Sequence, residues 1–213
     1  MRVVMRAMLL MALAILVLAP AWRPAAAGSA LALSPEQRAS VQKISDFMNS
    51  FTYLEGEFTQ ISPKGNTSRG IFYISKPGKM RFEYAPPNPF LIVADGKWLT
   101  IKNRDKEQGD QFPLSETPLR IVLAKQVDIL KDSRVLAFEA ADGLGAVTLE
   151  DKGGFLGGQL ILIYDEVSNM LQQWVVIDNK GRRTSVTLEN VVTGKVADPK
   201  LFVVKIERKE KLR

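Results

Sequence analysis

Short segments with a two-residue hydrophobic period recur along most of this chain and restrict its possible folds more than any other feature. Residues 79–85 are the clearest case, since Met80, Phe82 and Tyr84 alternate with charged side chains. Further strand-like segments begin at Leu54 and cover 69–75, 90–94, 98–103, 134–141, 146–150, 159–164, 170–177, 183–188 and 201–206. Turn-type links such as Asp95-Gly96 separate them. About ten short strands joined in this way predict one antiparallel sheet, strongly curved or barrel-like.

Two segments depart from this pattern and predict helices. Ser34-Pro35-Glu36-Gln37 combines an N-cap serine, a proline at the first helical position and the glutamine of a capping box. Apolar residues then recur at helical spacing, which predicts an amphipathic helix that ends at about Ser50. Residues 117–124 predict a short helix with Thr117 as its cap. We find no repeat or linker, so residues 28–213 are expected to form a single domain.

The first 27 residues predict a signal peptide rather than part of the fold. Arg2 and Arg6 precede an uncharged apolar run that is short for a membrane span, and Ala25-Ala26-Ala27 offers a cleavage site. An uncleaved membrane anchor is the alternative interpretation. Removing residues 1–27 takes away three arginines and no acids, so the net charge falls from +6 to 26 − 23 = +3. Nucleic acid is therefore not expected as a partner.

The chain has no cysteine and no histidine. Catalytic triads, cysteine nucleophiles, disulfides and zinc sites of the usual ligands are thereby excluded. Glu55 and Glu57 are spaced to share one strand face, which leaves a carboxylate hydrolase as a possible reading. A solvated outer face explains the same pair more simply. We expect no enzymatic activity, no cofactor and no metal site.

Apolar side chains form the most informative set. One strand carries Met80, Phe82 and Tyr84 on one face, and the next strand carries Leu91 and Val93 on one face. An ordinary hydrophobic core explains this pattern. However, a sheet of about ten strands that curls on itself encloses more space than side chains readily fill, and such sheets often hold a ligand. The two predicted helices could cover that interior.

Several motifs together resemble the periplasmic outer-membrane lipoprotein carrier (LolA) family. The core of the resemblance is Phe72-Tyr73-Ile74-Ser75-Lys76-Pro77-Gly78-Lys79-Met80-Arg81-Phe82-Glu83-Tyr84, then Pro87 and Pro89, then Leu91-Ile92-Val93-Ala94-Asp95-Gly96-Lys97-Trp98-Leu99. Phe58-Thr59-Gln60, Thr117-Pro118-Leu119 and Asp198-Pro199 extend it over about residues 35–205. It implies an incomplete antiparallel β-barrel of about eleven strands, with an N-terminal helix and a short lid helix over an apolar cavity.

The resemblance also implies a function. Family members accept acylated lipoproteins from an ABC-type transporter in the inner membrane, carry them across the periplasm, and release them to an acceptor lipoprotein or to the outer membrane itself. A monomer is expected. By position, the acyl chains would contact a cavity lined by Met48, Met80, Phe82, Tyr84, Leu91, Val93, Leu119 and Val122.

Two positions depart from the family pattern. Lys76 stands where the family has an arginine that hydrogen-bonds across the lid, and a lysine lacks the arginine's bidentate fork. Lys76 is therefore expected to act as a modest lid latch. Phe82 stands where tryptophan is common. A LolA-like protein that senses lipids or lipopeptides, or that shuttles a different lipid cargo, remains the alternative to a lipoprotein carrier.

Overall fold

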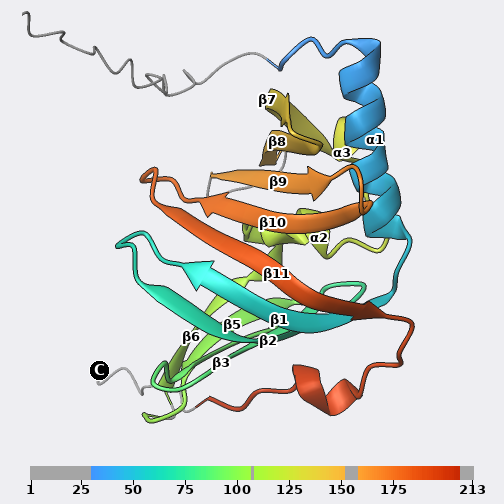
Figure 1. The fold of residues 1–213 in the computed structure, drawn as a ribbon. Coiled ribbons are helices and arrows are strands. Elements are labelled where there is room, and N and C mark those ends of the chain that lie inside the picture. Colours follow the sequence, from blue (N-terminus) through green and yellow to red (C-terminus); the bar gives the residue numbers. More distant parts are fainter. Residues whose placement is uncertain (1–29, 107, 152–157, 207–213) are drawn as a thin grey trace, which may run out of the picture.

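The computed structural model describes residues 30–106, 108–151 and 158–206, and these form one curled antiparallel sheet with the N-terminal helix and further short helices on its concave side (Figure 1). The predicted signal peptide lies outside the described residues. The sheet has eleven strands in the order β6-β5-β4-β3-β2-β1-β11-β10-β9-β8-β7. The terminal strands β6 and β7 do not pair with each other, so the sheet is open. The predicted fold class, a mainly β protein built on an incomplete antiparallel barrel, is thereby confirmed.

The strands lie in two consecutive runs that meet where β1 pairs with β11. The first run comprises β1 (Tyr53–Ile61), β2 (Thr67–Ser75), β3 (Lys79–Tyr84), β4 (Phe90–Asp95), β5 (Trp98–Asn103) and β6 (Gln108–Pro113). The second comprises β7 (Ser133–Ala141), β8 (Leu144–Asp151), β9 (Gln159–Asp165), β10 (Met170–Ile177) and β11 (Arg183–Thr193). Every pairing is antiparallel.

The helical segments precede, separate and follow these two runs of strands. They are α1 (Pro35–Asn49), η1 (Leu114–Glu116), α2 (Leu119–Val122), α3 (Ile129–Asp132) and η2 (Pro199–Phe202). In α1 the predicted capping box is confirmed, because the Gln37 amide donates to Ser34 Oγ at 3.3 Å and the Ser34 amide donates to Gln37 Oε1 at 2.9 Å. In α2 the prediction of Thr117 as cap is wrong. Pro118 is the N-cap, and the Thr117 hydroxyl donates backwards to the Leu114 carbonyl at 2.9 Å.

Two other sequence-based expectations need correction. Strand β6 was not predicted because Gln108–Pro113 contains Phe112 as its only large apolar residue and shows no alternation. Residues 201–206, predicted as a strand, instead contain the end of η2. There Pro199 occupies the first turn and the Asp198 side chain accepts a hydrogen bond from the Lys200 amide at 2.9 Å, which favours a helical turn.

In β1 and β2, two glycines leave space for phenylalanine rings of the neighbouring strand. Phe58 in β1 lies opposite Gly70 in β2, and Gly56 in β1 lies opposite Phe72 in β2. A Cβ on Gly70 would approach the Phe58 ring to 2.7 Å and the Glu83 carbonyl oxygen to 2.0 Å. A Cβ on Gly56 would approach the Phe72 ring to 2.9 Å. Each phenylalanine therefore occupies the space that a side chain on the neighbouring strand would need.

We predict that Gly70→Ala lowers the free energy of unfolding by about 3 kcal/mol, because the methyl group would overpack a site bounded by backbone. Urea unfolding followed by circular dichroism measures the change. Gly145→Ala is the matched control in β8, since its Cβ would find no neighbour closer than 3.7 Å. A loss below about 1 kcal/mol in Gly70→Ala, equal to that in the control, would contradict this account of the packing.

Candidate functional site

The concave face of the sheet carries a cluster of aromatic rings from distant strands. Phe82 in β3 lies at its centre, with ring centroids 4.7 Å from Phe58, 5.6 Å from Phe72 and 5.8 Å from Trp174. Trp174 is in β10, and three strands separate β10 from β3 in the sheet. Neighbouring strands lie about 4.8 Å apart, so a flat sheet would hold β3 and β10 about 19 Å apart. The Phe82–Trp174 contact therefore crosses the interior and shows how far the sheet curls.

Tyr84 joins this cluster with its ring edge toward Phe58, at a centroid distance of 5.0 Å. Its hydroxyl donates to Gln60 Oε1 at 2.6 Å, so the polar end of this buried side chain has a partner. Burial raises the pKa of Tyr84 to about 12, which keeps the hydroxyl neutral at physiological pH. The apolar character of the concave face is thereby preserved at this position.

The helices add their own apolar side chains to the same buried cluster. Of the predicted site residues, the structure brings Met48 from α1 and Val122 from α2 together with Met80, Phe82 and Tyr84 from β3. Leu119 in α2 is half-buried and packs against this cluster. Phe58, Phe72 and Trp174 belong to it as well and were not singled out from the sequence. The pairing of each phenylalanine with a glycine across β1 and β2 becomes apparent only when the register is known.

Leu91 and Val93 do not belong to the concave face, contrary to the prediction. The register of β3 and β4 places Val93 opposite Arg81 and Leu91 opposite Glu83, and directly opposed residues share a face. Both side chains therefore point to the convex side, where they form a separate buried cluster with Phe202 of η2. Leu91 and Val93 do share one face of β4, as predicted, but the alternation within a strand does not show which face of the sheet that is.

The predicted apolar interior is present, and around Phe82 the described side chains pack against one another. Phe58, Phe72, Phe82 and Trp174 are all 3% exposed or less, so these rings are almost completely covered by other side chains. A surface pocket of about 200 Å³ lies between α2 and α3, and it is lined by Arg120, Ile121, Ala124, Val127, Asp128 and Asp132. None of the predicted cavity residues lines this pocket. An acyl chain among these rings would have to displace protein side chains.

Helix α1 is joined to α3 and to the segment before it by side chains that bind backbone. Asn49 at the end of α1 makes two hydrogen bonds with Val127, donating to its carbonyl and accepting from its amide, each at 2.8 Å. Ser45 in the middle of α1 is buried and accepts a hydrogen bond from the Ile129 amide at 3.2 Å. These bonds make α1 and α3 one layer.

Lys76 lies beside the last turn of α1. Its amine donates to the Met48 carbonyl oxygen and sits 5.0 Å from the centre of the Phe51 ring. The predicted latch residue therefore contacts α1 rather than the short helix α2. The link to the α2 segment comes instead from backbone, since the Gly78 amide donates to the Leu123 carbonyl at 2.7 Å. Burial lowers the pKa of Lys76 to about 8, so the ammonium form that makes these contacts predominates at pH 7.

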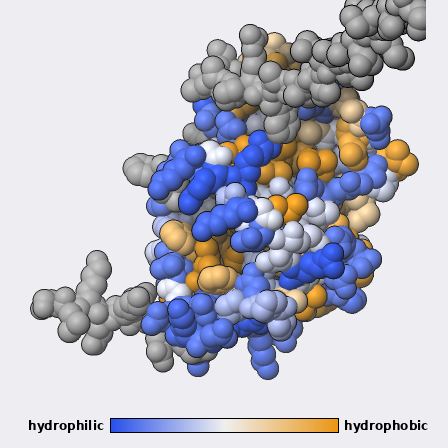
Figure 2. All heavy atoms as spheres, turned by 60° about the vertical axis from the view of Figure 1, so that its left-hand side comes forward, coloured by the Kyte–Doolittle hydropathy of each residue, from blue (hydrophilic) through white to orange (hydrophobic). Residues whose placement is uncertain are grey.

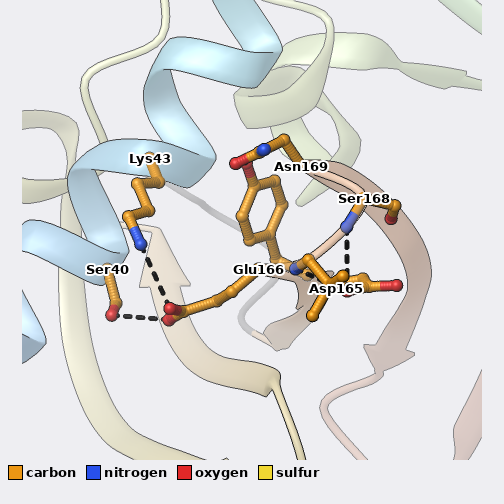
Figure 3. A network of polar contacts seen from close by, with 8 residues as sticks. Ser40, Lys43, Asp165, Glu166, Ser168 and Asn169 are labelled. Atoms are coloured by element: carbon orange, nitrogen blue, oxygen red, sulfur yellow. Dashed lines mark hydrogen bonds and ion pairs between the residues drawn. The ribbon is translucent and has the colours of Figure 1, made fainter.

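The N-terminal half of α1 is held to the sheet at a second place, the β9–β10 turn (Figure 3). The Ser40 hydroxyl donates to Glu166 Oε1 at 2.7 Å, and Lys43 Nζ lies 3.1 Å from Glu166 Oε2. The hydrogen bond from Ser40, followed by the contact with Lys43, holds the pKa of Glu166 below its usual range. Asp165 beside it accepts from the Val167 and Ser168 amides and so fixes the turn that presents Glu166.

Glu55 and Glu57, the pair considered for carboxylate chemistry, lie on the convex face. Glu55 accepts from the Tyr53 hydroxyl at 2.6 Å and forms an ion pair with Lys195, while Glu57 accepts from the Asn190 amide group at 2.8 Å. The Lys195 contact, followed by the Tyr53 hydrogen bond, lowers the pKa of Glu55, whereas a general acid needs a raised one. Among the described residues no group of three or more acidic side chains is placed to hold a metal ion.

We predict that Lys76 makes stability depend on pH between about 8 and 10.5. The unfolded lysine, with a pKa of 10.5, binds more protons in this window than the folded one, so the free energy of unfolding rises as the pH rises through it. A single titrating proton limits the slope of the free energy of unfolding to about 1.4 kcal/mol per pH unit. Because Lys76 is partly exposed, we expect a slope below this limit.

Urea unfolding of the wild type and of Lys76→Met at several pH values tests this prediction. The free energy of unfolding of the wild type should rise relative to that of Lys76→Met between pH 8 and pH 10. Lys180→Met, which removes an exposed lysine from the β10–β11 turn, is the control and should run parallel to the wild type. Parallel curves for Lys76→Met would show that Lys76 is not perturbed by burial.

Comparisons relate this chain to known proteins. Residues 49–205 match the family model for the outer membrane lipoprotein carrier protein LolA. The outer-membrane lipoprotein carrier protein of Methylococcus capsulatus is 27% identical over 174 residues, which cover 75% of this chain and 80% of that protein. The protein of the same name from Cupriavidus pinatubonensis is 30% identical over 144 residues, covering 57% of this chain and 68% of that protein.

Among solved structures, the chain is similar to a LolA superfamily protein from Nitrosomonas europaea, with a TM-score of 0.41 and 12% identity over 81% of this chain and 98% of that chain. It is also similar to the MucA/MucB complex of Pseudomonas aeruginosa, with a TM-score of 0.42 and 15% identity over 84% of this chain and 67% of that chain. The match of the family model to most of the chain shows that the chain belongs to the LolA family of outer membrane lipoprotein carrier proteins.

Proposed function

We propose that this protein is a periplasmic carrier that binds the acyl chains of lipoproteins released from the inner membrane and delivers them to the outer membrane. Residues 1–27 would direct export and be removed. An ABC-type transporter would load the carrier, and an acceptor lipoprotein or the outer membrane would receive the cargo. Membership of the LolA family supports this proposal, and so do the names of the curated relatives.

The observation that carries the proposal is the continuous apolar concave face of the sheet. The helices that cover this face make only a few polar contacts with the rest of the protein. A lipoprotein with three acyl chains exposes about 45 methylenes, and leaving them in water would cost on the order of 35 kcal/mol. A carrier must therefore cover most of that surface. The concave face of β1–β3 and β8–β10, together with α1 and α2, supplies the apolar side chains of one continuous buried cluster.

The packed interior supports reversible rather than tight binding. Loading would separate the helices from the sheet and displace rings such as Phe82 and Trp174 from each other. That free-energy cost offsets part of the gain from burying acyl chains, which lowers the net affinity. Unloading then needs no energy source in the carrier, provided that the acceptor covers the chains more completely. Within the described residues no helix is long and apolar enough to cross a bilayer.

Figure 2 shows the side that lies on the left of Figure 1, where hydrophobic residues gather in patches between hydrophilic ones. Large apolar side chains that remain partly exposed in the first half of the sheet include Ile61, Phe90 and Phe112. Phe90 points to the concave side, because it shares a strand face with Ile92, which is opposite Phe82. Phe112 points to the same side, because it is opposite Leu99, which in turn is opposite Ala94. They provide an apolar margin next to the covered face.

We predict that a brominated fatty acid quenches the fluorescence of Trp174, because a bromine atom must lie close to the indole to quench it. The expected mature protein contains two tryptophans, since Trp22 is in the predicted signal peptide. Trp174 is buried on the concave face, whereas Trp98 is 36% exposed and points to the convex side. Dibromostearate titrated into Trp98→Phe should therefore quench nearly all of the remaining emission.

Trp174→Phe is the matched control, because it keeps an aromatic ring in the core and leaves Trp98 as the reporter. Its emission should change little on titration with the same fatty acid. Equal quenching in the two variants would place the acyl chain elsewhere and overturn the site. Mass spectrometry of molecules that co-purify from the periplasm then separates a lipoprotein carrier, which should retain triacylated peptides, from a lipid sensor or a shuttle of another lipid.

A further inference from the structure

The concave face is chemically divided into two halves. The half formed by β1–β3, together with Trp174, is aromatic, as described above. The half formed by β8 and β9 is mainly aliphatic, with Leu149 opposite Leu160 and Val147 opposite Leu162, and Tyr164 is the aromatic residue at the end of β9. The four aliphatic side chains have no measurable exposure. A saturated acyl chain matches an aliphatic surface of this kind without having to separate the rings of Phe58, Phe72, Phe82 and Trp174 from one another.

Helix α1 covers the aliphatic half. It runs past the ends of β8, β9 and β10 (Figure 1), and its Phe47 ring lies 6.1 Å from the ring of Tyr164 in β9. Val41 and Ile44 on the same helix are buried in the same cluster as the four aliphatic residues. Access to this half of the concave face therefore depends on where the N-terminal part of α1 lies.

The attachments of α1 are unequal along its length. Its C-terminal end is fixed by Asn49, by the Lys76 contact with Met48 and by the short connection to β1, which begins at Tyr53. Ser45 is held by the Ile129 amide. Beyond Ser45 toward the N-terminus, the polar side-chain contacts between α1 and the described sheet residues are those of Ser40 and Lys43, and both go to Glu166 (Figure 3). Val41 and Ile44 add apolar packing there, and the Leu31 amide before the helix donates to the Val135 carbonyl of β7 at 2.8 Å. The part before Ser45 spans about 15 Å.

We infer that Glu166 is a positioning residue that controls the access of acyl chains to the aliphatic half, by holding the N-terminal part of α1 against the sheet. When its contacts with Ser40 and Lys43 break, the helix before Ser45 can move away while the bonds of Asn49 and Lys76 stay intact. The aliphatic half would then open independently of the aromatic half under α2. The inference rests on the proposed function for the identity of the ligand, and on the structure alone for the movement of α1.

Hydrogen–deuterium exchange of the ligand-free protein tests the movement. In Glu166→Ala we expect the amides of residues 39–44 to exchange about five- to tenfold faster than in the wild type, because local opening no longer breaks a hydrogen bond and an ion pair. Glu166→Gln, which keeps an acceptor for Ser40, should give an intermediate increase. Exchange in β8 and β9 should be unchanged, since opening of the helix leaves the strand pairing intact.

Arg182→Gln is the matched control, because it removes the Arg182–Asp178 ion pair in the β10–β11 turn. It should not alter exchange in α1. An unchanged rate for residues 39–44 in Glu166→Ala would overturn the inference, as would a uniform increase over helix and strands, which would indicate general destabilisation. Ser40→Ala provides a second variant and should raise the rate in the same segment by a smaller factor.

Binding of dibromostearate to the same variants separates this inference from the proposed function. Glu166→Ala should increase the association rate about five- to tenfold, as helix opening becomes more frequent. If exchange in α1 rises but neither protein binds the fatty acid, the role of Glu166 in holding α1 stands and the proposed function fails. If the wild type binds and Glu166→Ala binds at the same rate, access does not depend on Glu166 and the inference fails.

Discussion

The rest of the structure depends on the burial of one apolar surface, the concave face of an open sheet. A sheet of eleven strands that does not close leaves that face exposed unless something covers it. Here the sheet curls until Phe82 and Trp174 touch across the interior, and α1 and α2 cover what remains. The surface that stabilises the free protein is therefore the surface that would receive a lipid. Folding contacts and ligand contacts compete for the same side chains, which ties affinity to the cost of separating helix from sheet.

Much of this fold can be predicted from the sequence, because its strongest signals are local. The capping box at Ser34 and Gln37 marks the start of α1, and the alternation of Met80, Phe82 and Tyr84 identifies both a strand and its buried face. The remainder depends on register, which local patterns do not contain. Leu91 and Val93 alternate as Met80 and Phe82 do, and only the pairing of Val93 with Arg81 shows that they point the other way.

The candidate site was predictable in part for the same reason. Residues on the apolar face of a single predicted helix can be identified from the sequence. Met48 in α1 and Val122 in α2 are examples, and both lie in the concave cluster. The contacts that join segments were not, because Glu166 is about 125 residues from its partners Ser40 and Lys43. A turn sequence such as Asp165-Glu166 reads as solvated surface, and its contact with a helix can be recognised only in three dimensions.

The convex side explains why any opening should occur at the helices rather than in the sheet. The segment after β11 crosses the outside of the first strands, from the Lys195–Glu55 ion pair at β1 to Phe202, which packs on Leu91 and Val93. Arg81 fastens it by donating to the Leu201 carbonyl at 2.9 Å. This outer layer stiffens β1–β4 from behind with both apolar and polar contacts. The sheet is thus supported on its convex side. The helix layer, whose polar attachments come from a few side chains, is the part that can move when a ligand binds.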